Sequence, residues 1–103
     1  MISRVWHGWT KPEHADAYDA LLRAEILPGI HRVPGFRGAT LLRRRDGDEE
    51  EFVTITRFDD FDAVRAFAGD DYTRAVIAAD ARPLLARFDE RSVHYETVFS
   101  IDG

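Results

Sequence analysis

The chain has 103 residues, of which 45% are hydrophobic, a formal net charge of −5 and no cysteine. Its length and apolar content predict a single domain, residues 1–103, with a small core. The lack of cysteine excludes disulfide scaffolds and thiolate metal sites, and the negative charge argues against nucleic acid as a partner, because a phosphate backbone requires a basic surface.

The N-terminal segment predicts a strand followed by a helix. Ile2 to Trp9 alternates with large side chains on both faces, which is typical of a central strand. Thr10 and Glu13 have the spacing of a capping box, and Pro12 suits a first helical turn. The helix is expected to end near Pro28-Gly29 and to bury Tyr18, Leu21, Leu22 and Ile26.

A hairpin is expected after the turn Val33-Pro34-Gly35. Phe36 to Arg45 predicts its first strand, and Asp46-Gly47 is a residue pair that suits a tight hairpin turn. Counting outward from that turn places Arg45, Arg44 and Arg43 opposite Asp48, Glu49 and Glu50. Such exposed pairs contribute about 0.2–1 kcal/mol each, so the arginines indicate a solvated hairpin tip rather than a nucleic-acid patch.

The stretch from Glu51 to Gly69 predicts a second strand-helix unit. Phe52 to Phe58 carries β-branched and aromatic residues on both faces, which again indicates a central strand. Asp59 or Asp60 is expected to cap the next helix and Gly69 to end it. The apolar positions of that helix are Phe61, Val64, Phe67 and Ala68.

The C-terminal third predicts weaker elements: a second short helix through Tyr72, Val76 and Ile77, a turn opened by Pro83, and a last strand from Ser92 to Phe99. The order β-α-β-β-α-β, with a broken second helix, predicts an α+β ferredoxin-like fold with a four-stranded antiparallel sheet. One sheet face takes the helices. The other would expose apolar groups, so we expect a homodimer through the sheet face.

Four segments distributed along nearly the whole chain carry a family resemblance: VWHGWT, VPGFRGATLLRR, EFVTITRFDDFDAVRAFAGDDY and RFDERSVHYETV. They resemble the antibiotic biosynthesis monooxygenase family of dimeric α/β barrels. The resemblance implies a pocket between the sheet and the helices of each subunit. Some relatives use it for cofactor-independent oxidation of polycyclic phenols, and others for oxidative haem breakdown.

The haem branch of this family implies three pocket residues: an Asn, a Trp at the end of the third strand and an iron-ligating His on the following helix. This sequence contains no Asn, has Phe58 where the Trp would stand and has Val76 where the His would fall. Because the axial ligand sets haem chemistry, haem degradation is not expected.

Two imidazoles are the candidates for a catalytic base. We predict His94 or His7, because only an imidazole has an ordinary pKa near neutral pH. The predicted substrate-binding residues are Arg4, Trp6, Trp9, Phe58, Tyr72 and Tyr95. His94 and Tyr95 are adjacent on one strand and therefore point to opposite faces. The strand register, which the sequence does not determine, decides whether His94 meets Trp6 and Arg4 or His7 and Trp9. The alternative is that the histidines and tryptophans serve as core or dimer contacts.

No nucleotide-binding glycine motif, P-loop or serine elbow is present, and four scattered histidines make no metal site, so no cofactor and no metal are expected. No apolar run is long enough for a membrane span or a signal peptide, which predicts a soluble cytoplasmic protein with no membrane partner. We expect a small-molecule pocket protein that oxidises an aromatic or quinol-like ligand with O2. Two alternatives stay open: a non-catalytic ligand-binding or stress-associated dimer, and a lactone isomerase or cyclase.

Overall fold

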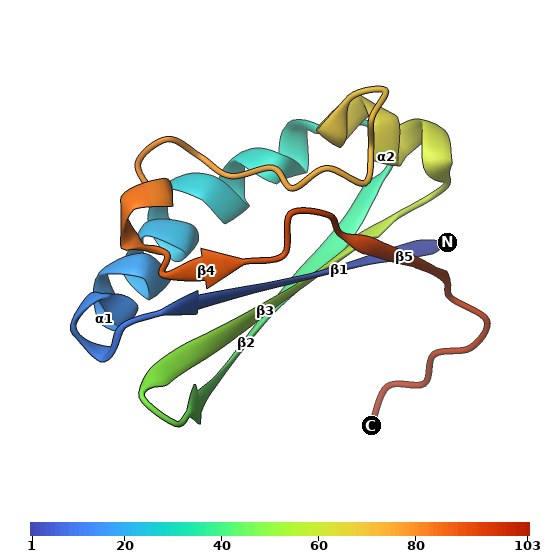
Figure 1. Ribbon diagram of the computed structural model, residues 1–103. Coiled ribbons are helices and arrows are strands. Elements are labelled where there is room, and N and C mark those ends of the chain that lie inside the picture. Colours follow the sequence, from blue (N-terminus) through green and yellow to red (C-terminus); the bar gives the residue numbers. More distant parts are fainter.

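The computed structural model describes the backbone of residues 1–103 and all side chains except those of residues 25–27, so the predicted burial of Ile26 lies outside the described side chains. One antiparallel sheet contains β1 (Ile2–Thr10), β2 (Phe36–Asp46), β3 (Glu49–Phe58), β4 (Arg87–Phe88) and β5 (Val93–Glu96). The order is β2-β3-β1, and β4 and β5 both pair with the free edge of β1 (Figure 1). The first and third strands are therefore central, and the predicted ferredoxin-like α+β fold is confirmed.

The last strand is broken in two, whereas the sequence predicted one strand from Ser92 to Phe99. β4 pairs with β1 at Gly8 and Trp9, and β5 pairs with Ile2 to Val5. Between them the backbone turns to another partner: the N–H of Ser92 donates to the carbonyl of Thr73. Residues 97–103 then leave the sheet.

The helical layer begins with α1 (Pro12–Leu21), and helical turns continue through Leu22–Ile26 and Leu27–Arg32. The predicted end near Pro28-Gly29 was wrong, because Pro28 lies in the first turn of the last segment, where no N–H donor is needed. The predicted capping box was also wrong. Thr10 is the last residue of β1, and Lys11 occupies the cap position without a side-chain hydrogen bond.

The second helix, α2 (Phe61–Ala68), has the predicted boundaries. Asp60 caps it by accepting a hydrogen bond from the Ala63 N–H at 2.9 Å, and Gly69 ends it with φ +87°. The short helix expected through Tyr72, Val76 and Ile77 is absent: residues 70–81, which we call the strap, form turns and irregular backbone. The predicted turn at Pro83 is a short 3-10 helix, Arg82–Leu84.

The hairpin of β2 and β3 has a different turn from the predicted one. Asp46 pairs with Glu49 and Arg45 with Glu50, so Gly47 and Asp48 form the turn. Gly47 has φ +61°, which suits the first position of such a turn. Compared with the predicted pairing, each β2 residue lies opposite a β3 residue two positions further along, such as Glu50 instead of Asp48 for Arg45. Because side chains alternate with a period of two, each stays on its predicted face.

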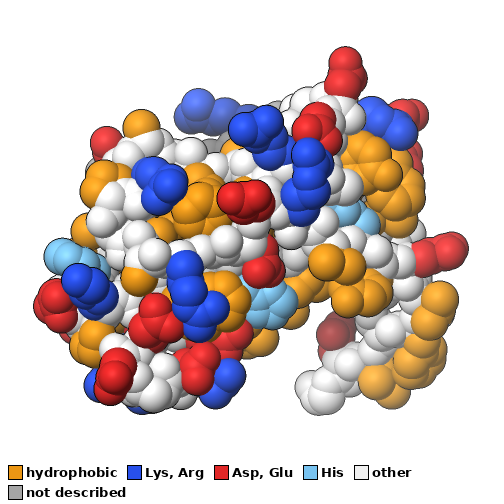
Figure 2. Space-filling model, viewed as in Figure 1, with side chains coloured by type: hydrophobic (Ala, Val, Ile, Leu, Met, Phe, Trp, Pro, Cys, Tyr) orange, Lys and Arg blue, Asp and Glu red, His pale blue; other side chains and the backbone are white. Residues whose placement is uncertain are grey.

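The helices and the strap cover one face of the sheet (Figure 1). Two buried clusters fill this layer, one around Tyr18 and Phe52 and the other around Phe58 and Val64. The opposite face, which we call the outer face, is only half-buried at the centre of β1 and β3. Figure 2 shows apolar side chains gathered on the C-terminal tail, at the lower right, where Val98, Phe99 and Ile101 are 76–89% exposed. No helix in the described part of the chain is long and apolar enough to cross a membrane.

Candidate active site

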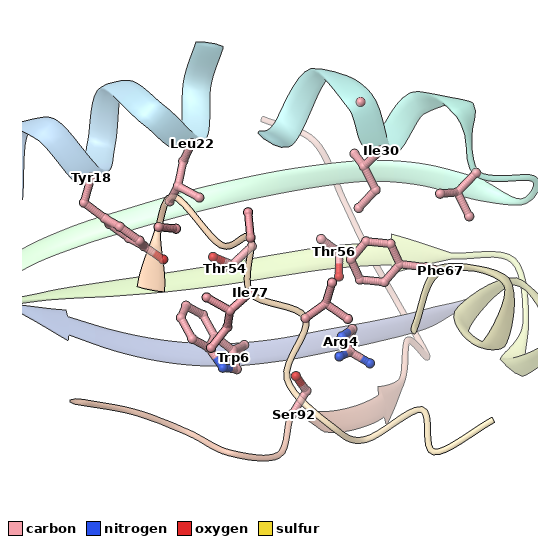
Figure 3. A pocket seen from close by; sticks show the side chains of 15 residues that line it. Arg4, Trp6, Tyr18, Leu22, Ile30, Thr54, Thr56, Phe67, Ile77 and Ser92 are labelled. Carbon is pink, nitrogen blue, oxygen red and sulfur yellow. The ribbon is translucent and has the colours of Figure 1, made fainter. Parts of the chain in front are cut away.

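A cavity of about 260 Å3 lies between the sheet and the helical layer (Figure 3). β1 and β3 form its floor, α1 and the turns after it form one wall, and α2 and the strap form the other. Most of the lining is apolar. Ligand pockets typically measure about 300–1,000 Å3, so this cavity suits a compact ligand.

The strand register places the floor residues. Alternation along β1 turns Arg4 and Trp6 toward the helices, and the pairing with β3 sets them opposite Thr56 and Thr54. The indole of Trp6 lies along β1, because a Cβ atom at Gly8 would come within 2.6 Å of the ring. The indole N–H donates to the carbonyl of Asp89 at 2.7 Å. Trp6 is therefore a fixed wall of the cavity.

Arg4 places a positive charge on the cavity floor. Its residue surface is only 4% exposed. Nη1 donates to the carbonyl of Tyr72 and to Nε2 of His94 at 3.1 Å, and Nη2 donates to the carbonyl of Arg74 at 2.9 Å. Burial lowers the pKa of Arg4 to about 10, so the guanidinium remains charged at neutral pH. Among the described residues, no carboxylate lies within ion-pair distance of it.

His94 reaches the cavity only through Arg4. The guanidinium has donors alone, so Nε2 of His94 accepts, and the neutral ring carries its proton on Nδ1. Burial, and then the charge of Arg4, hold the pKa of His94 below its ordinary value. The ring contacts Tyr72 edge-on, with centroids 5.2 Å apart. Register thus brings His94 to Arg4 rather than to His7 and Trp9.

The other predicted site residues fall into three places. Tyr72 lies on the strap and supports Arg4 through its carbonyl, and Phe58 is fully buried in the second core cluster. His7, Trp9 and Tyr95 belong to the outer face. There the His7 ring stacks on Trp9 and its Nδ1 lies 2.8 Å from Asp89 Oδ2. Of the eight predicted residues, the cavity lining includes Arg4 and Trp6.

Sequence reasoning missed several lining residues, including Tyr18, Thr54, Thr56, Phe67 and Ser92. Thr54 and Thr56 lie on the same predicted strand face as two phenylalanines, and that pair of hydroxyls on an otherwise apolar face was an available signal. Ser92 had none, because its position depends on the break between β4 and β5.

Haem does not fit the residues of this cavity. Haem iron requires an axial ligand such as His, Cys, Met or Tyr. The described lining contains no histidine, and its tyrosine, Tyr18, is packed edge-on against Phe52 with its pKa raised by burial, which opposes a tyrosinate ligand. Among the described residues no group of three His, Asp or Glu side chains could hold a metal ion.

Comparison with known proteins identifies the family of this chain. The family model described as antibiotic biosynthesis monooxygenase matches residues 1–79. The solved structures that share the fold include the three that follow. SnoaB, a cofactor-independent oxygenase from Streptomyces nogalater, is 24% identical over 99% of this chain and 97% of its own, with a TM-score of 0.68.

The second is the ActVA-Orf6 monooxygenase of Streptomyces coelicolor with the ligand Nanaomycin D, at 19% identity over 99% and 91% of the two chains and a TM-score of 0.65. The third is the haem-degrader MhuD from Mycobacterium tuberculosis, at 20% identity over 99% and 100% and a TM-score of 0.65. No curated protein matches. Because the family model covers more than half of its length, this chain belongs to the antibiotic biosynthesis monooxygenase family.

Proposed function

We propose that the protein is a cofactor-independent oxygenase that oxidises a compact phenol or quinol with O2. The observation that carries this proposal is the cavity: a mostly apolar space, covered by helices and strap, with few polar groups on its floor. Such an apolar lining would disfavour water and offers Trp6 and Phe67 as aromatic contacts for a flat ring. Family membership and the oxygenases that share the fold support the same chemistry.

The reaction balances without a cofactor. A phenolate gives one electron to O2, and the resulting radical pair combines to form a carbon–oxygen bond on the ring. The ring carbon then loses its proton, the O–O bond breaks, one oxygen leaves as water and the other stays as a carbonyl. One phenol and one O2 thus give one quinone and one water. The protein has to favour the phenolate and keep the ring in place.

His94 and His7 take different roles in this proposal. His94 is a positioning residue that accepts a hydrogen bond from Arg4 and so orients the guanidinium beside the cavity. His7 lies on the outer face with Trp9 and Tyr95, where it would contact a second subunit.

The proposed dimer uses the outer face. Val5 pairs with Ile55 on one side and with Val93 on the other, which makes an apolar stripe across three strands. Val93 and Tyr95 are 51% and 57% exposed in the single chain. A second copy packed on this stripe would remove that apolar surface from water.

An oxygen-uptake assay tests the function. With chelator-treated protein and 1,4-dihydroxynaphthalene or anthrone, O2 consumption should exceed the spontaneous rate and give one quinone-type product per O2. Ala78→Trp, at the cavity lining, should abolish the excess, whereas Ala79→Trp, which is adjacent but outside the lining, should leave it unchanged.

Two outcomes would contradict the oxygenase proposal. The first is saturable binding of these compounds without any O2 consumption, which would favour the non-catalytic binder. The second is O2 consumption that Ala78→Trp does not reduce, since the reaction would then take place elsewhere on the molecule.

A further inference from the structure

The structure assigns Arg4 and Ser92 to an anion subsite in the cavity, where they hold the ionised oxygen of an aromatic ligand. This inference rests on the proposed function for the aromatic class of the ligand. It adds the state in which the ligand binds: the conjugate base of an acidic hydroxyl, rather than the neutral molecule.

Arg4 has both charge and donors to spare. A guanidinium carries five N–H donors, and the contacts with Tyr72, Arg74 and His94 use three of them. All three acceptors are neutral groups. Removing a charge from water is costly unless an opposite charge or further hydrogen bonds compensate for it. An oxyanion in the cavity would supply both.

Ser92 is the second, independent observation. The residue is only 5% exposed, lines the cavity, and its Oγ has no hydrogen-bond partner among the described residues. Its backbone N–H is already bound to Thr73, so the hydroxyl alone remains available. Figure 3 shows this hydroxyl directed into the cavity, on the same side as Arg4. Thr10 Oγ1, the other such hydroxyl, is not part of the lining.

Among the described residues, the surroundings of Arg4 offer no competing anion and no free base. The Nε2 lone pair of His94 on β5 already accepts a hydrogen bond from Arg4, and the strap presents backbone carbonyls to the guanidinium. The phenol of Tyr18 on the opposite wall stays protonated, because burial raises its pKa. A nearby positive charge favours the charged form of an acid. Arg4 would therefore lower the pKa of a bound phenol, and the site would obtain the phenolate without a general base.

The test compares an anion with its neutral ether. 2-Hydroxy-1,4-naphthoquinone is ionised at pH 7.5, whereas 2-methoxy-1,4-naphthoquinone carries no charge. Binding is measured under argon by quenching of tryptophan fluorescence, to which Trp6 on the cavity wall contributes, with calorimetry as a check. The wild-type protein should bind the hydroxy compound about 10- to 100-fold more tightly than the ether, the usual contribution of hydrogen bonds to a charged group.

Three variants locate the residues responsible for the preference, and two controls accompany them. Arg4→Gln should reduce it to within about threefold, Arg4→Lys should retain part of it because the charge remains, and Ser92→Ala should weaken the hydroxy compound about tenfold without affecting the ether. The matched controls are Arg45→Gln at the exposed hairpin tip and Ser100→Ala in the exposed tail, which should both behave as wild type. If Arg4→Gln fails to fold, Ser92→Ala and Arg4→Lys still decide the matter.

Equal affinity of the wild-type protein for both compounds would overturn the subsite. So would a preference that survives Arg4→Gln, or one that falls more than tenfold between 50 and 500 mM salt, since an exposed charge is screened and a buried one much less. The measurement is independent of turnover. A preserved preference without O2 consumption would contradict the oxygenase alone, and O2 consumption with equal affinities would contradict the subsite alone.

Discussion

Arg4 joins three separate parts of the chain while it faces the cavity. It starts on β1, bonds two carbonyls of the strap and reaches His94 on β5. A lysine could not make these contacts at once, because its three donors diverge from a single nitrogen. The residue that would bind a ligand anion therefore also holds the cavity walls in place.

The bond between Arg4 and His94 predicts a pH-dependent stability. The folded pKa of His94 is lowered, so below about pH 6.5 the unfolded chain takes up a proton that the folded chain resists. The contribution of His94 to the free energy of unfolding is therefore fully present above this pH and is lost as the pH falls below it. His94→Gln keeps an acceptor for Arg4 but does not titrate, so it should lose part of the decrease in Tm between pH 7.5 and 5.5.

The control for this experiment is His31→Gln, which removes an exposed imidazole that Arg4 does not contact. It should retain the wild-type pH dependence. If the Tm of His94→Gln falls between pH 7.5 and 5.5 as much as that of the wild type, the imidazole is not held neutral by Arg4.

Gly8 sets the position of the tryptophan wall, and this gives a second prediction at the residue scale. In Gly8→Ala the new Cβ would lie 2.6 Å from the Trp6 ring and 3.0 Å from Leu85, so the indole must shift. Overpacking of this kind costs about 1–3 kcal/mol, and the shifted ring should also weaken binding of the naphthoquinone anion. Urea unfolding and fluorescence titration measure the two effects.

Gly103→Ala in the exposed tail is the control, because a Cβ there meets nothing within 4 Å and the residue lies outside the cavity lining. It should change neither quantity. A Gly8→Ala protein with wild-type stability would mean that the Trp6 ring has another place to lie.

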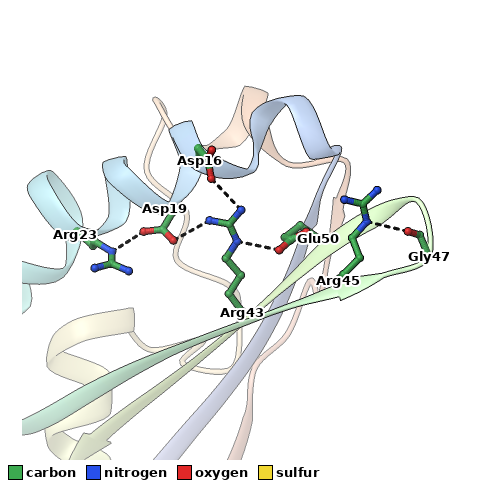
Figure 4. A network of polar contacts seen from close by, with 7 residues as sticks. All are labelled: Asp16, Asp19, Arg23, Arg43, Arg45, Gly47 and Glu50. Carbon is green, nitrogen blue, oxygen red and sulfur yellow. Dashed lines mark hydrogen bonds and ion pairs between the residues drawn. The ribbon is translucent and has the colours of Figure 1, made fainter.

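At the scale of elements, α1 and the β2–β3 hairpin are joined by one arginine (Figure 4). Arg43 bonds Asp16 and Asp19 on α1 and Glu50 on β3, at 2.9 to 3.0 Å. It was expected to pair with Glu50 as a direct cross-strand neighbour. The observed register makes it a diagonal neighbour of Glu50 and adds the two helix carboxylates.

Arg43→Met should lower the free energy of unfolding by about 1 kcal/mol, because a network of several charges contributes more than an isolated surface pair. The loss should shrink as salt is raised from 0.05 to 0.5 M. Arg45→Met is the control, since the one side-chain bond of Arg45 within the described part of the chain goes to the carbonyl of Gly47 in its own hairpin. If both variants lose the same free energy of unfolding, the charge network of Arg43 does not contribute more than a single exposed arginine.

The elements with regular periodicity could be predicted from sequence, and those built by distant contacts could not. β1, β3 and α2 follow from alternation, a capping aspartate and Gly69, all of which act locally. The strap and the broken last strand depend on hydrogen bonds between segments far apart, such as Ala75 N–H to Glu90 and Ser92 N–H to Thr73. The site residues divide in the same way: Arg4 and Trp6 lie on a predicted strand face, whereas the position of Ser92 depends on the break between β4 and β5.

At the scale of the whole molecule, the outer face predicts a dimer. Sedimentation at micromolar concentration should give about twice the chain mass of 11.8 kDa. Val93→Asp should yield a folded monomer, because Val93 is half exposed in the single chain and the new carboxylate would be buried only between subunits. Ala79→Asp, on the exposed strap, should remain a dimer.

A wild-type protein that sediments as a monomer at this concentration would contradict the dimer. A Val93→Asp protein that still dimerises would show that the subunits meet on a surface other than the outer face.

The irregular strap has a kinetic consequence. The strap lacks the internal hydrogen-bond ladder of a helix and is held by bonds to Arg4, Glu90, Arg91 and Ser92 and by apolar packing. We expect it to open locally while the sheet stays intact. The amide of Ala75 should therefore exchange with deuterated solvent far sooner than those at the centre of β3. A bound anion that holds Arg4 in place should slow the opening of the strap, and with it the exchange of the Ala75 amide.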